Sequence, residues 1–123
     1  MKYAYSRSII PPALVIPVVV QDKDRCNSTT IEAKVDTGAD VSTIPEAVAE
    51  TVHLKPVDFV DVRGSFDDYK AVPTFLIFVR LEDGREFRLN VVPNKKDIML
   101  LGRDALNDVI LNANGPKQVF TID

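Results

Sequence analysis

The residues best suited to chemistry are the acid, the hydroxyl and the glycine of Asp36-Thr37-Gly38. They directly follow residues 31–35, where apolar and charged side chains alternate as in a strand with one solvated face. Gly38 permits a tight turn and a close approach of another backbone, and the Thr37 hydroxyl can hold the loop in place. We expect an acid at the end of such a strand to be partly buried, which disfavours the charged form of a carboxyl group.

A single carboxyl group catalyses the hydrolysis of an amide poorly, because water must lose a proton while the carbonyl oxygen gains one. Two adjacent carboxyls that share one proton can do both, since like charges so close together cannot both ionise. The sequence Asp-Thr-Gly occurs once in the 123 residues. If such a pair exists, its second member must therefore come from another copy of the chain.

A second informative segment runs from Ile98 to Leu106, where an apolar stretch meets a glycine and then a charged helix start. Gly102 would let the apolar stretch lie close against another segment. Arg103 can bind an acid through two parallel hydrogen bonds, and Asp40 is a candidate partner. Asp104 in the first helical turn suits the positive end of the helix dipole.

Residues 35–40 (Val-Asp-Thr-Gly-Ala-Asp) and 100–106 (Leu-Leu-Gly-Arg-Asp-Ala-Leu) together resemble the retropepsin-like aspartic proteases. These are the retroviral proteases and their single-domain cellular and bacterial relatives. The order and separation of the two segments match, and the resemblance covers Ala13 to Ile122. It implies a small closed β-barrel with a flap hairpin and one Asp-Thr-Gly loop per chain. It also implies a homodimer that cuts peptides at an active site on the twofold axis, without a metal or another cofactor.

The same resemblance gives roles to the first loop residues. Asp36 would be the catalytic aspartate and would pair with the partner subunit's Asp36. Thr37 would bind across the twofold axis and, together with Gly38, would support the loop. Gly38 would also offer its backbone carbonyl to the substrate.

By resemblance, the next residues bind substrate or hold the loop. Ala39 would line the cleft, and Asp40 would contact the substrate backbone while pairing with Arg103. Gly102 and Arg103 would be structural supports. A purely structural role for the pair of Asp40 and Arg103 is an open alternative.

Residues 60–73 lie where the family has its flap, a hairpin that closes over the substrate. The substrate-binding candidates there are Val62, Arg63, Gly64, Ser65 and Phe66. Retroviral flaps are glycine-rich at the tip, whereas this segment has one glycine followed by the acids Asp67 and Asp68.

The chain ends bear on how two copies would assemble. The retroviral type interleaves both ends of each chain in a sheet shared by the dimer. Residues Val119–Ile122 could enter such a sheet, whereas the longer lead from Met1 to Pro12 departs from that pattern.

The elements that must position these residues are mostly strands. The apolar run 13–20 and the stretches 57–62, 75–81 and 87–91 predict strands. The dipeptide Asp83-Gly84 predicts a hairpin turn between the last two. Short apolar runs at 98–101 and 119–122 add two more strands.

Two short helices interrupt this pattern. Thr43 and Glu46 match a capping box, which predicts a helix that ends near His53. Helical spacing of apolar residues predicts a second helix over residues 103–111. We therefore expect one all-β domain over residues 1–123, with residues 1–12 as a lead segment. Its many short strands favour a closed or sandwiched barrel.

Composition excludes several classes of function. The net charge of −3 disfavours a broad attraction to nucleic acid or to an anionic membrane. The single cysteine, Cys26, excludes an intrachain disulfide and a cysteine-rich zinc site. The apolar stretch from Ile9 to Val20 is interrupted by prolines and is shorter than the ~20 residues of a membrane-spanning helix. It also lacks the cleavage site of a signal peptide, so we expect a cytoplasmic protein.

Other polar residues have simpler interpretations. His53 stands alone and is expected to be structural or exposed. Asp22 and Asp24 lack the glycine and the spacing of a calcium-binding loop, so a solvated face is the better interpretation.

The leading hypothesis is a homodimeric aspartic endopeptidase in which Asp36 of each subunit activates a water molecule. One alternative is a non-catalytic dimerisation or peptide-binding module with the same barrel. Another is a competent barrel that is silent as a monomer and gated by weak dimerisation.

Overall fold

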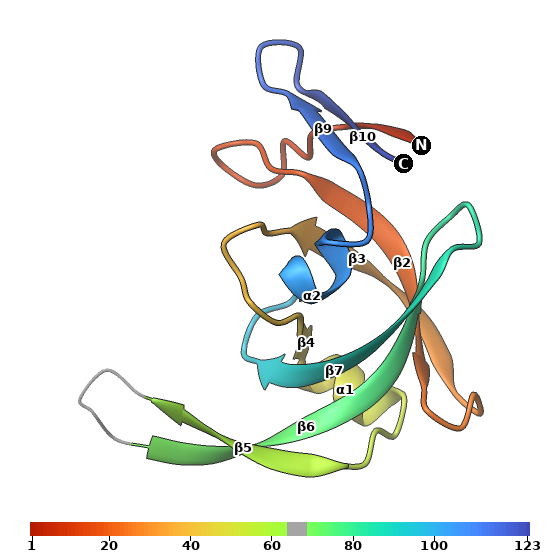
Figure 1. Ribbon diagram of the computed structural model, residues 1–123, viewed down its shortest axis with the longest axis vertical. Coiled ribbons are helices and arrows are strands. Elements are labelled where there is room, and N and C mark those ends of the chain that lie inside the picture. The colour runs from red at the N-terminus through yellow and green to blue at the C-terminus, as the bar shows by residue number, and fades with distance from the viewer. Residues whose placement is uncertain (64–68) are drawn as a thin grey trace.

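Strands of the chain close into a barrel in the computed structural model, which describes residues 1–63 and 69–123 (Figure 1). Around the ring, the order is β2 (Val15–Asp22), β3 (Ser28–Val35), β8 (Met99–Leu101), β4 (Thr43–Pro45), β7 (Glu86–Asn94) and β6 (Tyr69–Arg80). An antiparallel pairing of β6 with β2 closes the ring. The expected all-β closed barrel is thereby confirmed.

The β6 strand is long enough to serve two partners. Its C-terminal half pairs with β2, whereas its N-terminal half pairs with β5 (Asp58–Arg63) and extends away from the barrel (Figure 1). The predicted hairpin turn joins β6 to β7, and Gly84 has a φ of 90° there, a conformation that glycine adopts without strain.

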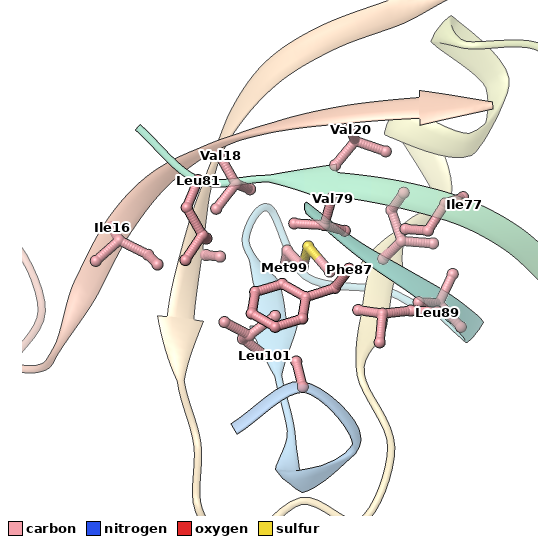
Figure 2. Close-up of a cluster of buried hydrophobic side chains, with 14 of the residues drawn as sticks. Ile16, Val18, Val20, Ile77, Val79, Leu81, Phe87, Leu89, Met99 and Leu101 are labelled. Atoms are coloured by element: carbon pink, nitrogen blue, oxygen red, sulfur yellow. The ribbon is translucent and has the colours of Figure 1, made fainter. Parts of the chain in front are cut away.

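The barrel interior is filled by alternate residues of its strands, as the period of two predicts (Figure 2). Aliphatic side chains dominate, and Phe87 and Met99 lie in the middle of the cluster (Figure 2). The other labelled members are Ile16, Val18, Val20, Ile77, Val79, Leu81, Leu89 and Leu101. Burial of these apolar surfaces makes the barrel a rigid scaffold for the loops at its ends.

The loop that carries Asp36 joins β3 to β4, but these two strands are not neighbours. The β8 strand lies between them, parallel to β3 and antiparallel to β4. The segment after β8 must therefore pass directly beside the loop. There it forms α2 (Arg103–Leu106), which lies beside the loop (Figure 1).

The first helix, α1 (Glu46–Thr51), begins after Pro45, and the predicted capping box is wrong. Thr43 belongs to β4, where it is in register with Leu100 and Val92. Its hydroxyl accepts a hydrogen bond from Asn94 Nδ2 at 2.6 Å. Thr43 therefore pairs within the sheet and does not cap the helix.

The second helix is shorter than predicted. It ends at Leu106 instead of Leu111, and Leu111 is the first residue of β9 (Leu111–Asn114). The β9 strand pairs antiparallel with β10 (Val119–Ile122). This long-range pairing overrides the helical spacing of the apolar residues.

Both chain ends lie in one three-stranded sheet, in the order β1 (Lys2–Ala4), β10, β9. Since β10 has a partner from its own chain on each edge, it has no free edge for a sheet shared with a second chain. The single chain thus uses Val119–Ile122 within its own sheet. Tyr3 stacks on Phe120, with ring centroids 5.3 Å apart, and burial is the main cause that raises the pKa of Tyr3 to about 12.

The expectation of a solvated Asp22 is also wrong. Asp22 ends β2 with only 8% of its surface exposed. Its Oδ1 accepts hydrogen bonds from the backbone N–H groups of Cys26 at 2.8 Å and Asn27 at 2.9 Å. The carboxyl therefore replaces water as the partner of two turn amides.

None of the described helices is long and apolar enough to cross a membrane.

Candidate functional site

Asp36 lies at the mouth of the barrel, where β3 ends. Its backbone N–H donates to the carbonyl of Leu101 at 3.0 Å and extends the ladder between β3 and β8 by one residue. The side chain is half-buried, and its Oδ1 accepts a hydrogen bond from the N–H of Gly38 at 2.9 Å. The carboxyl is thus held by the loop that follows it and remains partly open to solvent.

Gly38 leaves the space in which this carboxyl sits. A Cβ atom at Gly38 would lie 3.3 Å from Asp36 Oδ1, which is tighter than an ordinary contact. Thr37 is exposed on the surface of the single chain. The absence of a side chain at Gly38 thus leaves room for the Asp36 carboxyl, and the Thr37 side chain is free to contact solvent or another molecule.

Gly102 allows the close approach that its type predicted. A Cβ atom there would lie 2.9 Å from the carbonyl oxygen of Ala39 and 2.9 Å from the carbonyl carbon of Val41. Both contacts are with backbone, which cannot move aside without displacing the loop. The absence of a side chain at Gly102 therefore sets the distance between α2 and the Asp36 loop.

The predicted pair of Asp40 and Arg103 is present, with Arg103 Nη2 donating to Asp40 Oδ1. Its side chains are 82% and 49% exposed, and exposed ion pairs of this kind add little stability. Arg103 also donates from its backbone N–H to the carbonyl of Ala39 at 2.9 Å, and from Nη1 to the carbonyl of Thr37 at 3.5 Å. Arg103 thus binds the loop at three points.

Ser42 and Asp104 form a second brace that sequence reasoning missed. Ser42 is fully buried, and its hydroxyl donates to Asp104 Oδ1 at 2.7 Å and accepts from the N–H of Gly102 at 3.0 Å. The other carboxylate oxygen, Oδ2, accepts from the N–H of Ser42 at 2.9 Å. The only sequence signal was an acid in the first turn of a helix, which does not reveal a partner 62 residues away.

The predicted flap segment is described only in part. Val62 and Arg63 belong to β5, at the far end of the hairpin from the barrel. Gly64, Ser65 and Phe66 lie outside the described residues. Their predicted contacts with substrate stay predictions.

A groove of about 630 Å³ lies between α1 and β6, away from Asp36. Its lining includes Ala49, Leu54, Pro73 and Phe75, and Asp36 is not among its lining residues. His53 also lines the groove and is exposed, as predicted for this histidine. In the part of the chain that the structure describes, no three His, Cys, Asp or Glu side chains gather in a way that could hold a metal ion.

The arrangement therefore offers one acid on a loop fixed by two braces. One brace is Arg103, and the other is the network of Ser42, Asp104 and Gly102. A fixed, partly exposed carboxyl can position a water molecule and exchange a proton with it. Hydrolysis of an amide by two carboxyls that share a proton needs a second acid at the same place.

Comparison with models of known families shows which family the chain belongs to. Residues 24–108 match the model of the family described as gag-polyprotein putative aspartyl protease. The matched range includes both the Asp36 loop and the segment around Gly102 and Arg103. A comparison with curated protein sequences found no match.

Solved structures share the fold at low sequence identity. A retropepsin-like aspartic protease from Rickettsia conorii is 18% identical with a TM-score of 0.65, and the match covers 98% of this chain and 86% of that chain. The EIAV protease is 21% identical with a TM-score of 0.56, covering 86% of this chain and 93% of that one. The simian foamy virus protease is 20% identical, also with a TM-score of 0.56, covering 74% and 91%. The chain therefore belongs to the gag-polyprotein putative aspartyl protease family and has the retropepsin-like fold.

Proposed function

We propose that residues 1–123 form one subunit of a homodimeric aspartic endopeptidase in which two Asp36 carboxyls meet on a twofold axis. The observation that carries this proposal is the Asp36 loop itself. It presents one half-buried carboxyl per chain, held by Gly38 and braced from α2. A second copy is the simplest source of the second carboxyl, because Asp-Thr-Gly occurs once.

In the proposed reaction, one Asp36 is ionised and the other is protonated. The carboxylate takes a proton from water as the oxygen attacks the peptide carbonyl, and the carboxyl group gives its proton to the carbonyl oxygen. The Asp36 that took the proton from water then gives it to the amide nitrogen, and the C–N bond breaks. The other Asp36 takes back a proton from the hydroxyl group of the tetrahedral intermediate, which leaves a carboxylic acid and an amine. The loop bonds contribute by fixing each carboxyl before substrate arrives.

The neighbouring residues take supporting roles in this proposal. The exposed Thr37 binds across the dimer axis, while Gly38, Ala39 and Asp40 contact the backbone of an extended peptide. The β5–β6 hairpin, with the segment Val62–Phe66, acts as the flap. Gly102 and Arg103 support the loop without touching the reacting atoms.

Assembly must then differ from an interleaving of β10 strands, because both edges of β10 are occupied within one chain. The outer edges of β1 and β9 are the edges of that sheet at which a second copy could add a strand. The proposal also places the enzyme in the cytoplasm, where an exposed free thiol such as Cys26 stays reduced.

The test is the cleavage of a randomised peptide library by the wild type and by Asp36→Asn. The asparagine keeps an oxygen for the Gly38 N–H, so the loop is preserved while proton exchange is lost. We expect cleavage by the wild type and by the control Asp97→Asn, which changes an exposed acid outside the loop, and none by Asp36→Asn. Cleavage that survives in Asp36→Asn would contradict the proposal. Peptide binding by the wild type without cleavage at any pH would favour the non-catalytic module.

A further inference from the structure

A row of four side chains crosses the outer face of the barrel and starts beside Asp36. Lys34 on β3 is in register with Leu100 on β8, Leu100 with Thr43 on β4, and Thr43 with Val92 on β7. All four are half-buried. Their chain neighbours are buried core residues, which places the row on the opposite face of the sheet. These neighbours are Ala33, Val35, Met99, Leu101, Ile44 and Val91.

Asp36 lies on the same face as this row. Its backbone bond to Leu101 continues the ladder of β3, so the alternation of side chains continues to Asp36. Lys34 is two residues earlier on the strand, which puts the two Cα atoms about 7 Å apart. The four-carbon stem of a lysine can cover that distance. Its ammonium can therefore reach a side chain of any molecule that lies against the Asp36 carboxyl.

Lys34 is the one charged member of the row. In the described part of the chain, it takes part in none of the ion pairs. Glu32 follows on the same face, but it is exposed and lies two residues further from Asp36. On its other side, Lys34 is in register with Val15 of β2. The position nearest Asp36 therefore presents a cation between aliphatic neighbours, Val15 and Leu100.

We propose that Lys34 is a specificity-determining residue that binds an acidic side chain of the peptide next to the bond that is cut. The inference rests on the proposed function, because it takes Asp36 as the point at which that bond lies. An ammonium forms a charge-assisted hydrogen bond with a carboxylate, which is stronger than a bond between neutral groups. Twofold symmetry supplies one Lys34 on each side of the cut bond, so glutamate or aspartate is selected at both flanking positions.

The first test reads the residues that flank the cut bond in a randomised library. We expect the wild type to favour glutamate over glutamine there by about tenfold in kcat/KM. Lys34→Met keeps the aliphatic stem and should lose this preference, while Lys34→Glu should reverse it towards lysine and arginine. The control is Lys23→Met, which removes an exposed cation in the turn at the other end of β3 and should cleave like the wild type.

The second test measures binding and separates this inference from the proposed function. Peptides with glutamate or glutamine at the flanking positions are titrated against Asp36→Asn with and without Lys34→Met. We expect the glutamate peptide to bind about tenfold more tightly only when Lys34 is present. Cleavage that depends on Asp36 but shows no acidic preference, or a preference that survives Lys34→Met, would overturn the role of Lys34 and leave the function standing. Absence of both cleavage and binding would overturn both.

Discussion

Two aspartates lie beyond opposite ends of β3, and their carboxyl groups have different roles. Asp22 is the last residue of β2, before the turn into β3, and Asp36 is the first residue after β3. Asp22 is buried, and its Oδ1 is occupied by the N–H groups of Cys26 and Asn27. Asp36 is half-buried, and one oxygen accepts a single bond, from Gly38. Asp22 thus holds a turn together, whereas Asp36 is itself held by its turn.

This difference shows that the surroundings of an aspartate decide whether its carboxyl is available for chemistry. Around Asp36, other residues hold the loop in place. Gly102 allows α2 to lie close to the loop, and the hydrogen bonds of Ser42 and Asp104 fix the loop to α2. Around Asp22, the carboxyl does the fastening. Substitutions at the two ends of β3 should therefore have opposite consequences for activity and for stability.

The largest expected effect is the loss of activity in Asp36→Asn, by about 10²–10⁴-fold, the usual contribution of a positioned acid or base. Its free energy of unfolding should stay close to that of the wild type, because the oxygen that accepts from Gly38 is retained. Kinetics with a cleaved peptide and urea unfolding measure the two effects. A large loss of stability would show that Asp36, like Asp22, mainly holds its turn.

Gly102→Ala should lower both quantities. The new methyl group meets the backbone of Ala39 and Val41 at 2.9 Å, and overpacking of this kind costs about 1–3 kcal/mol. Because the loop itself must shift, kcat should fall by up to about 10²-fold. Gly115→Ala is the matched control, since a Cβ there meets nothing within 4 Å. Full activity in Gly102→Ala would contradict the view that this contact positions Asp36.

Asp22→Ala should lower the free energy of unfolding by about 1 kcal/mol, because two partly buried hydrogen bonds, from the N–H groups of Cys26 and Asn27, lose their acceptor. Its kcat, measured on the folded fraction, should be unchanged. Asp22→Asn retains an acceptor oxygen and should recover most of the stability. Thermal unfolding followed by circular dichroism measures the loss. An unfolding curve like that of the wild type would mean that the turn does not depend on this carboxyl.

The smallest effect is expected for Glu86→Gln, which weakens the contact between Glu86 and Arg25 in the turn between β2 and β3. Arg25 has a φ of 58° and is held by two hydrogen bonds to Glu86, at 2.6 and 3.0 Å, while its guanidinium lies 3.8 Å from the centre of the Phe78 ring. The hydrogen bond from Arg25 holds the pKa of Glu86 below its usual value. A carboxyl with a lowered pKa adds stability above its pKa in the unfolded chain and loses it as the pH falls through its pKa in the folded chain.

The stability difference between the wild type and Glu86→Gln should therefore be present at neutral pH and vanish in acid. Urea unfolding at a series of pH values measures it. A difference that grows as the pH falls would have the wrong sign for this pair.

Most of the barrel could be predicted from the sequence, because its strands alternate and its hairpin carries Asp83-Gly84. The errors arose where long-range pairing decides the structure. Thr43 pairs in a sheet instead of capping a helix, and Leu111, the predicted last residue of the second helix, pairs with Ile122 of β10.

The parts of the candidate site that depend on the chemistry of single residue types could be predicted. Gly102 and the pair of Asp40 and Arg103 follow from their chemistry and are present. The buried bond between Ser42 and Asp104 could not be predicted, because neither residue type specifies a partner so distant in sequence. The buried role of Asp22 was missed for a related reason, since only the folded turn brings the amides of Cys26 and Asn27 to its carboxyl.

The central claim is that two Asp36 carboxyls from two chains form one site. The most direct measurement mixes wild-type protein with Asp36→Asn at constant total concentration, after subunits have exchanged and sedimentation has shown that both dimerise equally. If each site needs both aspartates, activity follows the square of the wild-type fraction, and an equal mixture retains about one quarter of it. A linear fall, to about one half in the equal mixture, would contradict the claim, because each chain would then act with its own Asp36 alone.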